Sequence, residues 1–255
     1  MHDFLFTYYS LRPAQLRRWH PGAGVALADA GERAGWRDHV TVAGAVTLDA
    51  EAFAARRAAT LAHVRDVLAA TAGRPAHLRC FGLHEWAMVY RTDDVRHQRY
   101  PLRLGAAGTD AVVDAHRIRC SHHDAFRFFT DAARPLNALQ PRREDQVALE
   151  QPGCLHATMD LYKWAYKLGP AVPGELLLDC FDLAGDTRSL DMRAAPYDLS
   201  ALGVVPVRIE TPEGKAEYVA EQRALALRGQ ALRERLLAVL ERLPEPASAP
   251  EIVAP

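Results

Sequence analysis

The sequence contains no uninterrupted apolar stretch close to the roughly 20 residues that a membrane-spanning helix requires. Residues 1–10 mix His2 and Asp3 with aromatic side chains, whereas a secretory signal has a basic segment followed by an apolar run. No Gly/Ser-rich or Pro-rich stretch inside the chain marks a flexible linker. These absences predict a cytoplasmic protein with no membrane partner and no separately linked domains.

Cysteine and lysine are both scarce. The four cysteines lie far apart, so in a reducing compartment we expect thiols or metal ligands rather than a disulfide framework. Of the 31 basic residues only three are lysines, at positions 163, 167 and 215. A lysine kept in so arginine-rich a chain can mark a need for a compact or deprotonatable amine, and chance is the plain alternative.

An excess of positive charge is also missing, because the formal net charge is -1. Proteins that hold nucleic acid mainly through its phosphates usually carry a clear excess of Lys and Arg, so any nucleic-acid contact has to be local. The sequence also lacks Gly-x-Gly-x-x-Gly, Gly-x-x-x-x-Gly-Lys-Ser/Thr and Gly-x-Ser-x-Gly. Rossmann, phosphate-loop NTPase and serine-hydrolase assignments therefore lose their usual support.

The sequence does have strong helical patterns. Asp49 is a plausible N-cap for a helix that reaches residue 72 and ends at Gly73 and Pro75. An aromatic helical segment precedes a break near Pro13. Further helices are expected over residues 122–133, 152–168, 174–190 and 213–243.

Strand patterns are shorter and fewer. Val40, Val42 and Val46 alternate within residues 25–48, and short strands are also expected at residues 101–104, 111–113 and 204–209. The balance favours a mainly α or α+β fold. With 49% hydrophobic residues the chain can bury a substantial core, so we expect a single compact helical domain with a few short strands over residues 1–243. Residues 244–255 are too rich in Pro and Ala to pack and are predicted to form a disordered tail.

The first candidate site is the segment Cys120-Ser-His122-His123-Asp124, at the entrance of an expected helix. One histidine can transfer a proton or bind a metal while Asp124 orients it, because imidazole titrates near neutrality and its second nitrogen needs a partner. In the simpler interpretation, Asp124 is an acid in the first turn of the helix, where the helix dipole favours it.

The second candidate site lies in the most aromatic of the expected helices. Spacings of three and four residues place four polar groups along one stripe, with Trp164 one turn beyond the acid: His156, Asp160, Lys163 and Lys167. If the stripe faces a cleft, the pKa values of its amine, imidazole and carboxylate can be pushed apart for catalysis. If it faces solvent, it is an ordinary salt-bridged surface.

Two further segments carry polar groups that suit a pocket. His84, Glu85 and Trp86 interrupt an apolar run, either as hydrogen-bonded core residues or as part of a binding pocket. After residue 190, two acids bracket Arg193 beside Tyr197. This arrangement is either an ion pair that braces a turn or a site for an anion or a base.

Cysteine and histidine alternate in two of these segments, as Cys120 with His122 and Cys154 with His156. The four groups would complete a tetrahedral zinc site if they met in space, although the strong Cys-x-x-Cys signal is absent. One functional hypothesis is therefore a metal-dependent enzyme, with zinc or iron, that acts on a small molecule such as a nucleobase or nucleoside. Another is a binding module without catalysis, in which the same polar groups only hold a ligand.

Six blocks of sequence, which together span nearly the whole chain, carry a family resemblance. They are HDFLFTYYSLRPAQLRRWHPG from residue 2, CFGLHEWAMVYR from 80, CSHHDAFRFFT from 120, LEQPGCLHATMDLYKWAYKL from 149, DMRAAPYDL, and PVRIETPEGKAEYV. In these blocks the chain resembles a group of bacterial proteins catalogued as 3-methyladenine DNA glycosylases. The resemblance implies a DNA partner and an N-glycosylase that hydrolyses the glycosidic bond of alkylated purines without a cofactor. A helix-hairpin-helix with a Gly-rich turn is not recognisable.

The chemistry that the resemblance implies asks for few groups. A 3-methylated adenine is cationic and leaves readily, so the enzyme has mainly to extrude the base, stack it on aromatic rings and place a carboxylate near the developing cationic sugar. Asp160 would supply the carboxylate, His123 or His156 would assist proton transfer, and Lys163 would be the partner of Asp160 or an amine nucleophile. The candidate stacking rings are Trp86, Tyr162, Trp164 and Tyr166, and the candidate phosphate-binding groups are Arg17, Arg18, Arg142 and Arg143.

Overall fold

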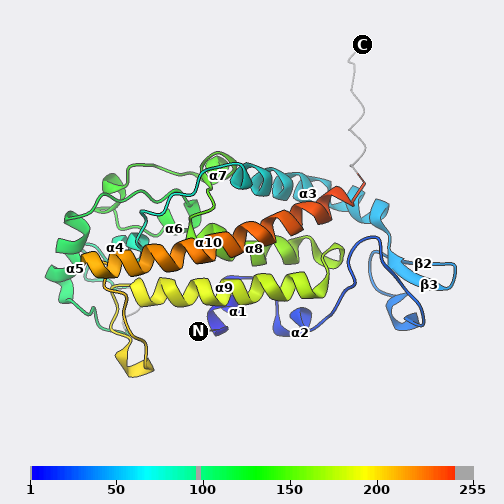
Figure 1. Ribbon diagram of the computed structural model, residues 1–255, viewed down its shortest axis with the longest axis horizontal. Helices are drawn as coiled ribbons and strands as arrows, with labels where there is room; N and C mark the ends of the chain where they lie inside the picture. The colour runs from blue at the N-terminus through cyan, green and yellow to red at the C-terminus, as the bar shows by residue number, and fades with distance from the viewer. Residues whose placement is uncertain (1, 96–98, 245–255) are drawn as a thin grey trace, which may run out of the picture.

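The computed structural model describes residues 2–95 and 99–244, and the tail expected over residues 244–255 lies outside this part except for its first residue. The described chain is mainly helical with one small sheet, as the sequence predicts. The long helices run along the long axis of the molecule, and the sheet lies at one end (Figure 1). These helices are α3 (Ala50–Ala72), α8 (Leu155–Lys167), α9 (Gly174–Ala194) and α10 (Pro212–Glu241).

Shorter elements fill the space around the long helices. The short helices are α1 (His2–Tyr8), α2 (Pro13–Leu16), α4 (Leu83–Ala87), α5 (Gly105–Asp114), α6 (His123–Phe126) and α7 (Gln146–Leu149). The antiparallel sheet has β3 (Ala45–Leu48) between β1 (Ala26–Leu27) and β2 (His39–Val42). Val46 and Leu48 turn toward the core, whereas Val40 and Val42 are exposed. The strand pattern predicted within residues 25–48 is therefore confirmed.

Side-chain caps define where two of the long helices begin. The Asp49 carboxylate accepts a hydrogen bond from the Ala52 amide at 2.9 Å, which confirms the predicted N-cap of α3. The Thr211 hydroxyl accepts from the Gly214 amide at 3.1 Å at the start of α10, and Pro212 occupies the first turn. Each cap satisfies one backbone amide that the helix leaves unpaired, which stabilises the protein by about 1 kcal/mol.

Helices α8, α9 and α10 pack against one another, with α9 and α10 side by side along the molecule (Figure 1). The stripe of Leu225, Leu232 and Leu236 on α10 is buried, as its helical spacing predicts. Burying each such side chain contributes about 1.5–3 kcal/mol. A Cβ added at Gly229 would lie 3.2 Å from Cγ2 of Thr158, so glycine at this position lets α10 approach α8 closely.

The main cluster of buried apolar side chains extends from Leu5 to Leu243, and a smaller cluster lies around Tyr197. The largest fully buried side chains are those of Trp86 and Trp164. Within the described chain, no helix is both long enough and apolar enough to cross a membrane.

The strands predicted at residues 101–104, 111–113 and 204–209 are not formed. Val112 lies on the buried side of α5 instead. Leu102 makes only an isolated antiparallel bridge with Tyr197. Residues 204–209 pair with no described strand, and the amide of Val207 donates instead to the Arg193 carbonyl at 2.9 Å. A short apolar run fits a buried helix or a buried loop as well as a strand, so periodicity alone does not distinguish them.

The helix predicted over residues 122–133 is only the single turn α6. Beyond it the chain turns, and the Thr130 hydroxyl donates to the Tyr90 carbonyl at 2.9 Å while the Thr130 amide donates to the Ala87 carbonyl. These bonds tie the segment to α4 and use backbone groups that a longer helix would have paired internally.

Candidate functional site

The polar stripe of α8 faces the interior and a cavity rather than open solvent. Asp160 is 1% exposed and the Lys163 side chain 15% exposed. The Lys163 ammonium donates a hydrogen bond to Asp160 one turn earlier. The solvent-facing alternative for this stripe is therefore wrong.

His122 contacts Asp160 from a segment that precedes α6. The chain before it is clamped by Asn137, whose side chain accepts from the Cys120 amide at 2.7 Å and donates to the Cys120 carbonyl at 2.9 Å. This clamp places His122 Nε2 at 3.4 Å from Asp160 Oδ2 and 3.9 Å from Glu150 Oε2. The ring is 3% exposed, and its contact with Asp160 is an ion-pair contact rather than a well-aligned hydrogen bond. We call His122, Glu150 and Asp160 the cavity triad.

The two carboxyl groups of the cavity triad have opposite electrostatic environments. Burial would raise the pKa of Asp160, but the Lys163 ammonium and His122 outweigh burial and lower it. Asp160 also accepts from the Tyr9 hydroxyl at 2.9 Å. Burial raises the pKa of Glu150, whose carboxylate accepts from the Gln146 amide nitrogen at 2.7 Å. Neighbouring acids with pKa values pushed apart are typical of sites that bind or transfer charge.

A cavity of about 340 Å³ opens beside this triad, and we call it the α8 cavity. His123 and Asp124 lie on its wall with Nδ1 and Oδ1 3.4 Å apart, and Lys163 Nζ is 4.0 Å from Asp124 Oδ2. The structure therefore brings the two predicted segments together. The wall consists of His63, Ser121, His122, His123, Asp124, Arg143, Gln146, Glu150, Lys163, Trp164 and Lys167.

The environment of Lys163 bears on its predicted roles. Burial would lower the pKa of this amine, but Asp160 outweighs burial and raises it. A charged ammonium is a poor nucleophile. The geometry therefore favours Lys163 as an ion-pair partner of Asp160 over an amine nucleophile.

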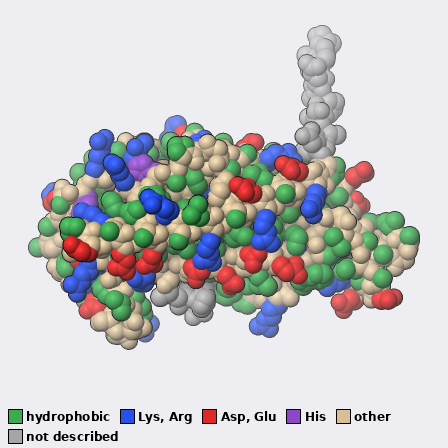
Figure 2. All heavy atoms as spheres, viewed as in Figure 1, with side chains coloured by type: hydrophobic (Ala, Val, Ile, Leu, Met, Phe, Trp, Pro, Cys, Tyr) green, Lys and Arg blue, Asp and Glu red, His purple; other side chains and the backbone are tan. Residues whose placement is uncertain are grey.

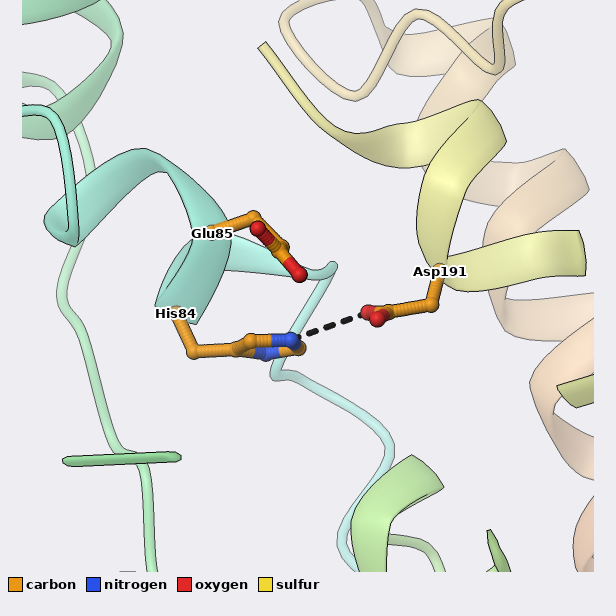
Figure 3. Close-up of side chains that lie close together, drawn as sticks. All are labelled: His84, Glu85 and Asp191. Carbon is orange, nitrogen blue, oxygen red and sulfur yellow. Dashed lines mark ion pairs between the residues drawn. The ribbon is translucent and has the colours of Figure 1, made fainter. Parts of the chain in front are cut away.

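His84, Glu85 and Asp191 form a second buried group, which we call the core triad (Figure 3). His84 and Glu85 come from α4 and Asp191 from α9, and His84 Nε2 lies 2.9 Å from Asp191 Oδ1. Arg188 donates to both acids, at 3.0 Å to Glu85. Burial opposes the charged imidazole, but Asp191 outweighs burial and raises the pKa of His84. With His84 protonated, the charges of His84 and Arg188 balance those of Glu85 and Asp191. The core triad together with Arg188 is therefore neutral without a ligand.

His156 lies between the two triads. Its ring centroid is 4.6 Å from that of His84 and 5.1 Å from that of His122, and the latter pair is stacked. Burial lowers the pKa of His156, and the neighbouring histidines lower it further. At neutral pH the ring is therefore uncharged and separates the two charged groups.

Two sets of potential metal ligands emerge among the described residues, namely the cavity triad and the core triad, each with ligand atoms within 4.8 Å of one another. Neither set contains a cysteine, so the predicted quartet Cys120, His122, Cys154 and His156 does not converge on one tetrahedral position. Burial raises the pKa of Cys120 to about 12, and its thiol donates to the His122 carbonyl at 3.6 Å. Burial also raises the pKa of Cys154.

Most of the rings predicted to stack on a base are buried in the core. Trp86 and Tyr162 are fully buried, and the Trp86 indole donates to the Ala194 carbonyl at 2.8 Å. Trp164 lines the α8 cavity but is 2% exposed, with Lys163 Nζ 4.4 Å from its ring centroid. Tyr166 packs partly buried against the core.

The remaining predicted site residues lie away from the α8 cavity, except for Arg143 on its wall. Arg193 pairs with Glu217 and Glu221 of α10 at 2.6 and 2.8 Å, which supports an ion pair that braces the chain. These partners are distant in sequence, and they are not Asp191 and Asp198, the two acids that bracket Arg193 in the sequence. Tyr197 is buried beside Arg193, Arg17 and Arg18 lie at the end of α2, and Arg142 pairs with Asp145.

Sequence reasoning missed two members of the site. Glu150 precedes α8, and Tyr9 reaches Asp160 from a position 151 residues away in the chain. The only available signal was that both stand inside the blocks that carry the family resemblance. Comparison with protein families, with curated proteins and with solved structures finds no match for this chain.

Proposed function

We propose that the protein is a metal-dependent enzyme whose ion is held by the cavity triad and whose substrate is a small polar molecule in the α8 cavity. One observation carries the proposal. Nε2 of the buried His122 ring lies 3.4 Å from Asp160 Oδ2 and 3.9 Å from Glu150 Oε2, and the three residues offer ligand atoms within 4.8 Å of one another. A buried imidazole that faces two carboxylates at these distances has the donor arrangement of a metal site that is open on one side.

The donor set and the cavity point to the kind of ion and substrate. One imidazole and two carboxylates suit a first-row divalent ion such as zinc or iron, and His122 and Glu150 also stand on the cavity wall. Such an ion polarises a substrate bond or lowers the pKa of a bound water. The volume of about 340 Å³ lies in the range of small-molecule pockets. Asp124, Arg143 and Lys163 on the wall suit a substrate with several hydrogen-bonding groups, such as a nucleobase or nucleoside.

Metal analysis of the purified protein tests this proposal. We expect about one zinc or iron per chain, and a loss of at least tenfold in metal affinity for His122→Ala and for Asp160→Asn. The matched control is His39→Ala on β2, in the sheet at one end of the molecule and outside the wall of the α8 cavity, which should keep the wild-type metal content (Figure 1). Protein that binds neither zinc nor iron when these ions are supplied would overturn the proposal.

An N-glycosylase that acts on alkylated purines in DNA is the second candidate function. The family resemblance supports it, and so does the buried carboxylate of Asp160. This carboxylate contacts His122 and Lys163, which line a cavity wide enough for one base. The test is release of free 3-methyladenine from methylated duplex DNA. Chelator-treated protein should remain active, because this chemistry needs no metal, whereas Asp160→Asn should lose at least a hundredfold in rate. No release where a known glycosylase works would remove this candidate.

A further inference from the structure

A second and larger cavity, of about 490 Å³, lies between the chain before α4 and the chain after α5. We call it the basic cavity. Figure 2 shows Lys and Arg side chains gathered near histidine at the end of the molecule where α4 and α5 lie. The polar part of the cavity wall consists of His77, Arg79, His116, Arg117 and Arg119, with no acidic residue.

The positive charge of this cavity is not compensated within the described chain. No described carboxylate lies within ion-pair distance of Arg79, Arg117 or Arg119. All three side chains are exposed, whereas other exposed arginines do pair with an acid, as Arg228 does with Asp186 at 2.7 Å. Guanidinium groups that line one hollow without an acid give it a positive potential, which attracts anions.

The two histidines of the wall support this interpretation. His116 Nδ1 contacts the Val112 carbonyl oxygen, which accepts only, so Nδ1 carries a proton. The buried Nε2 of His116 has no hydrogen-bond partner among the described residues. Burial lowers the pKa of His77, and Arg119 and Arg79 lower it further. The His77 ring therefore lies in a positively charged environment, and the His116 ring offers a nitrogen without a partner among the described residues.

The rest of the wall is apolar and includes an aromatic ring. Phe81 lines it with Leu83, Ala138 and Leu139, and packs with its ring centroid 6.1 Å from that of Tyr218. The Phe81 backbone has φ 50°, a left-handed conformation that non-glycine residues rarely adopt. Strained conformations of this kind are concentrated at binding sites, where the surrounding structure holds a side chain in place.

We propose that the basic cavity binds an organic phosphate, with the phosphate held by Arg117 and Arg119 and a planar ring lying against Phe81. Guanidinium forks match phosphate oxygens in bidentate geometry. The volume of about 490 Å³ suits a ligand of nucleotide size. The site shares none of its lining residues with the α8 cavity, so the proposal does not depend on a metal or on the reaction there.

Calorimetric titration of the purified chain with inorganic phosphate, deoxyadenosine monophosphate and a single-stranded 12-mer tests the proposal. Arg117→Ala and Arg119→Ala should each weaken nucleotide binding about tenfold or more, because each removes a charge-assisted hydrogen bond. Arg223→Ala, an exposed arginine on α10, is the matched control and should bind as the wild type does. Phe81→Leu should weaken the nucleotide but not inorganic phosphate.

The three ligands also identify the source of the phosphate. Binding of the mononucleotide as tightly as the 12-mer assigns the site to a small molecule. Tighter binding of the 12-mer, with a steep salt dependence, assigns it to a nucleic-acid backbone. The proposal fails if no ligand binds the wild type, or if Arg117→Ala and Arg119→Ala bind the nucleotide as Arg223→Ala does.

Discussion

Replacing Arg188 with methionine removes the guanidinium that joins the two acids of the core triad. The Arg188 side chain is 8% exposed and donates to Glu85 at 3.0 Å and to Asp191. Hydrogen bonds to charged groups contribute about 1.5–3 kcal/mol each, and removing one partner of a buried ion pair costs about 3–5 kcal/mol. We therefore expect Arg188→Met to lower the free energy of unfolding by about 4 kcal/mol.

Urea denaturation followed by circular dichroism measures this loss. In a chain of this size it corresponds to a fall in Tm of about 8–16 °C. Arg188→Lys keeps the charge but not the planar fork, so its loss should be intermediate. The control is Arg228→Met, which breaks the exposed pair with Asp186 and should cost no more than about 1 kcal/mol. The reasoning is refuted if Arg188→Met is no more destabilising than Arg228→Met.

Three further predictions concern stability. Because the pKa of His84 is raised by Asp191, its contribution is fully present below about pH 6.5 and is lost as the pH rises through the folded-state value. The free energy of unfolding should therefore fall from pH 6.5 to 9 in the wild type and fall less in His84→Gln; parallel curves would contradict this. Thr211→Ala should cost about 1 kcal/mol in urea denaturation and Thr211→Ser much less, because only alanine leaves the Gly214 amide without its cap; equal losses would count against the cap. Leu161→Ala, at a fully buried position of α8, should cost about 2–5 kcal/mol, and a loss below 1 kcal/mol would show that the core closes around the gap.

The long helices could be predicted from sequence because their signals are local. Asp49 and the apolar spacing that follows it define α3, and the leucine stripe of α10 defines its buried face. Short apolar runs carry no such signal. Val112 and Val207 were expected in strands, but the first is buried on a helix and the second in a loop, because tertiary packing decides how such runs are buried.

The site was predictable in its residue types but only partly in its members. Spacing alone placed Asp160 and Lys163 on one face of a helix, and the structure brings His122 to that face. Glu150 and Tyr9 join through contacts between segments that no local pattern connects. The aromatic residues were misjudged for a related reason. Large rings such as Trp86 are found in cores as readily as in pockets, and sequence does not say which.

The position of His156 between the rings of His84 and His122 has a consequence for how the protein can evolve. A side chain of another size or charge at this position alters both of its neighbours at once. Substitutions in one triad are therefore expected to be epistatic with substitutions in the other, although the two sets of acids share no direct bond. Sequence change in this part of the protein should proceed in coordinated sets rather than residue by residue.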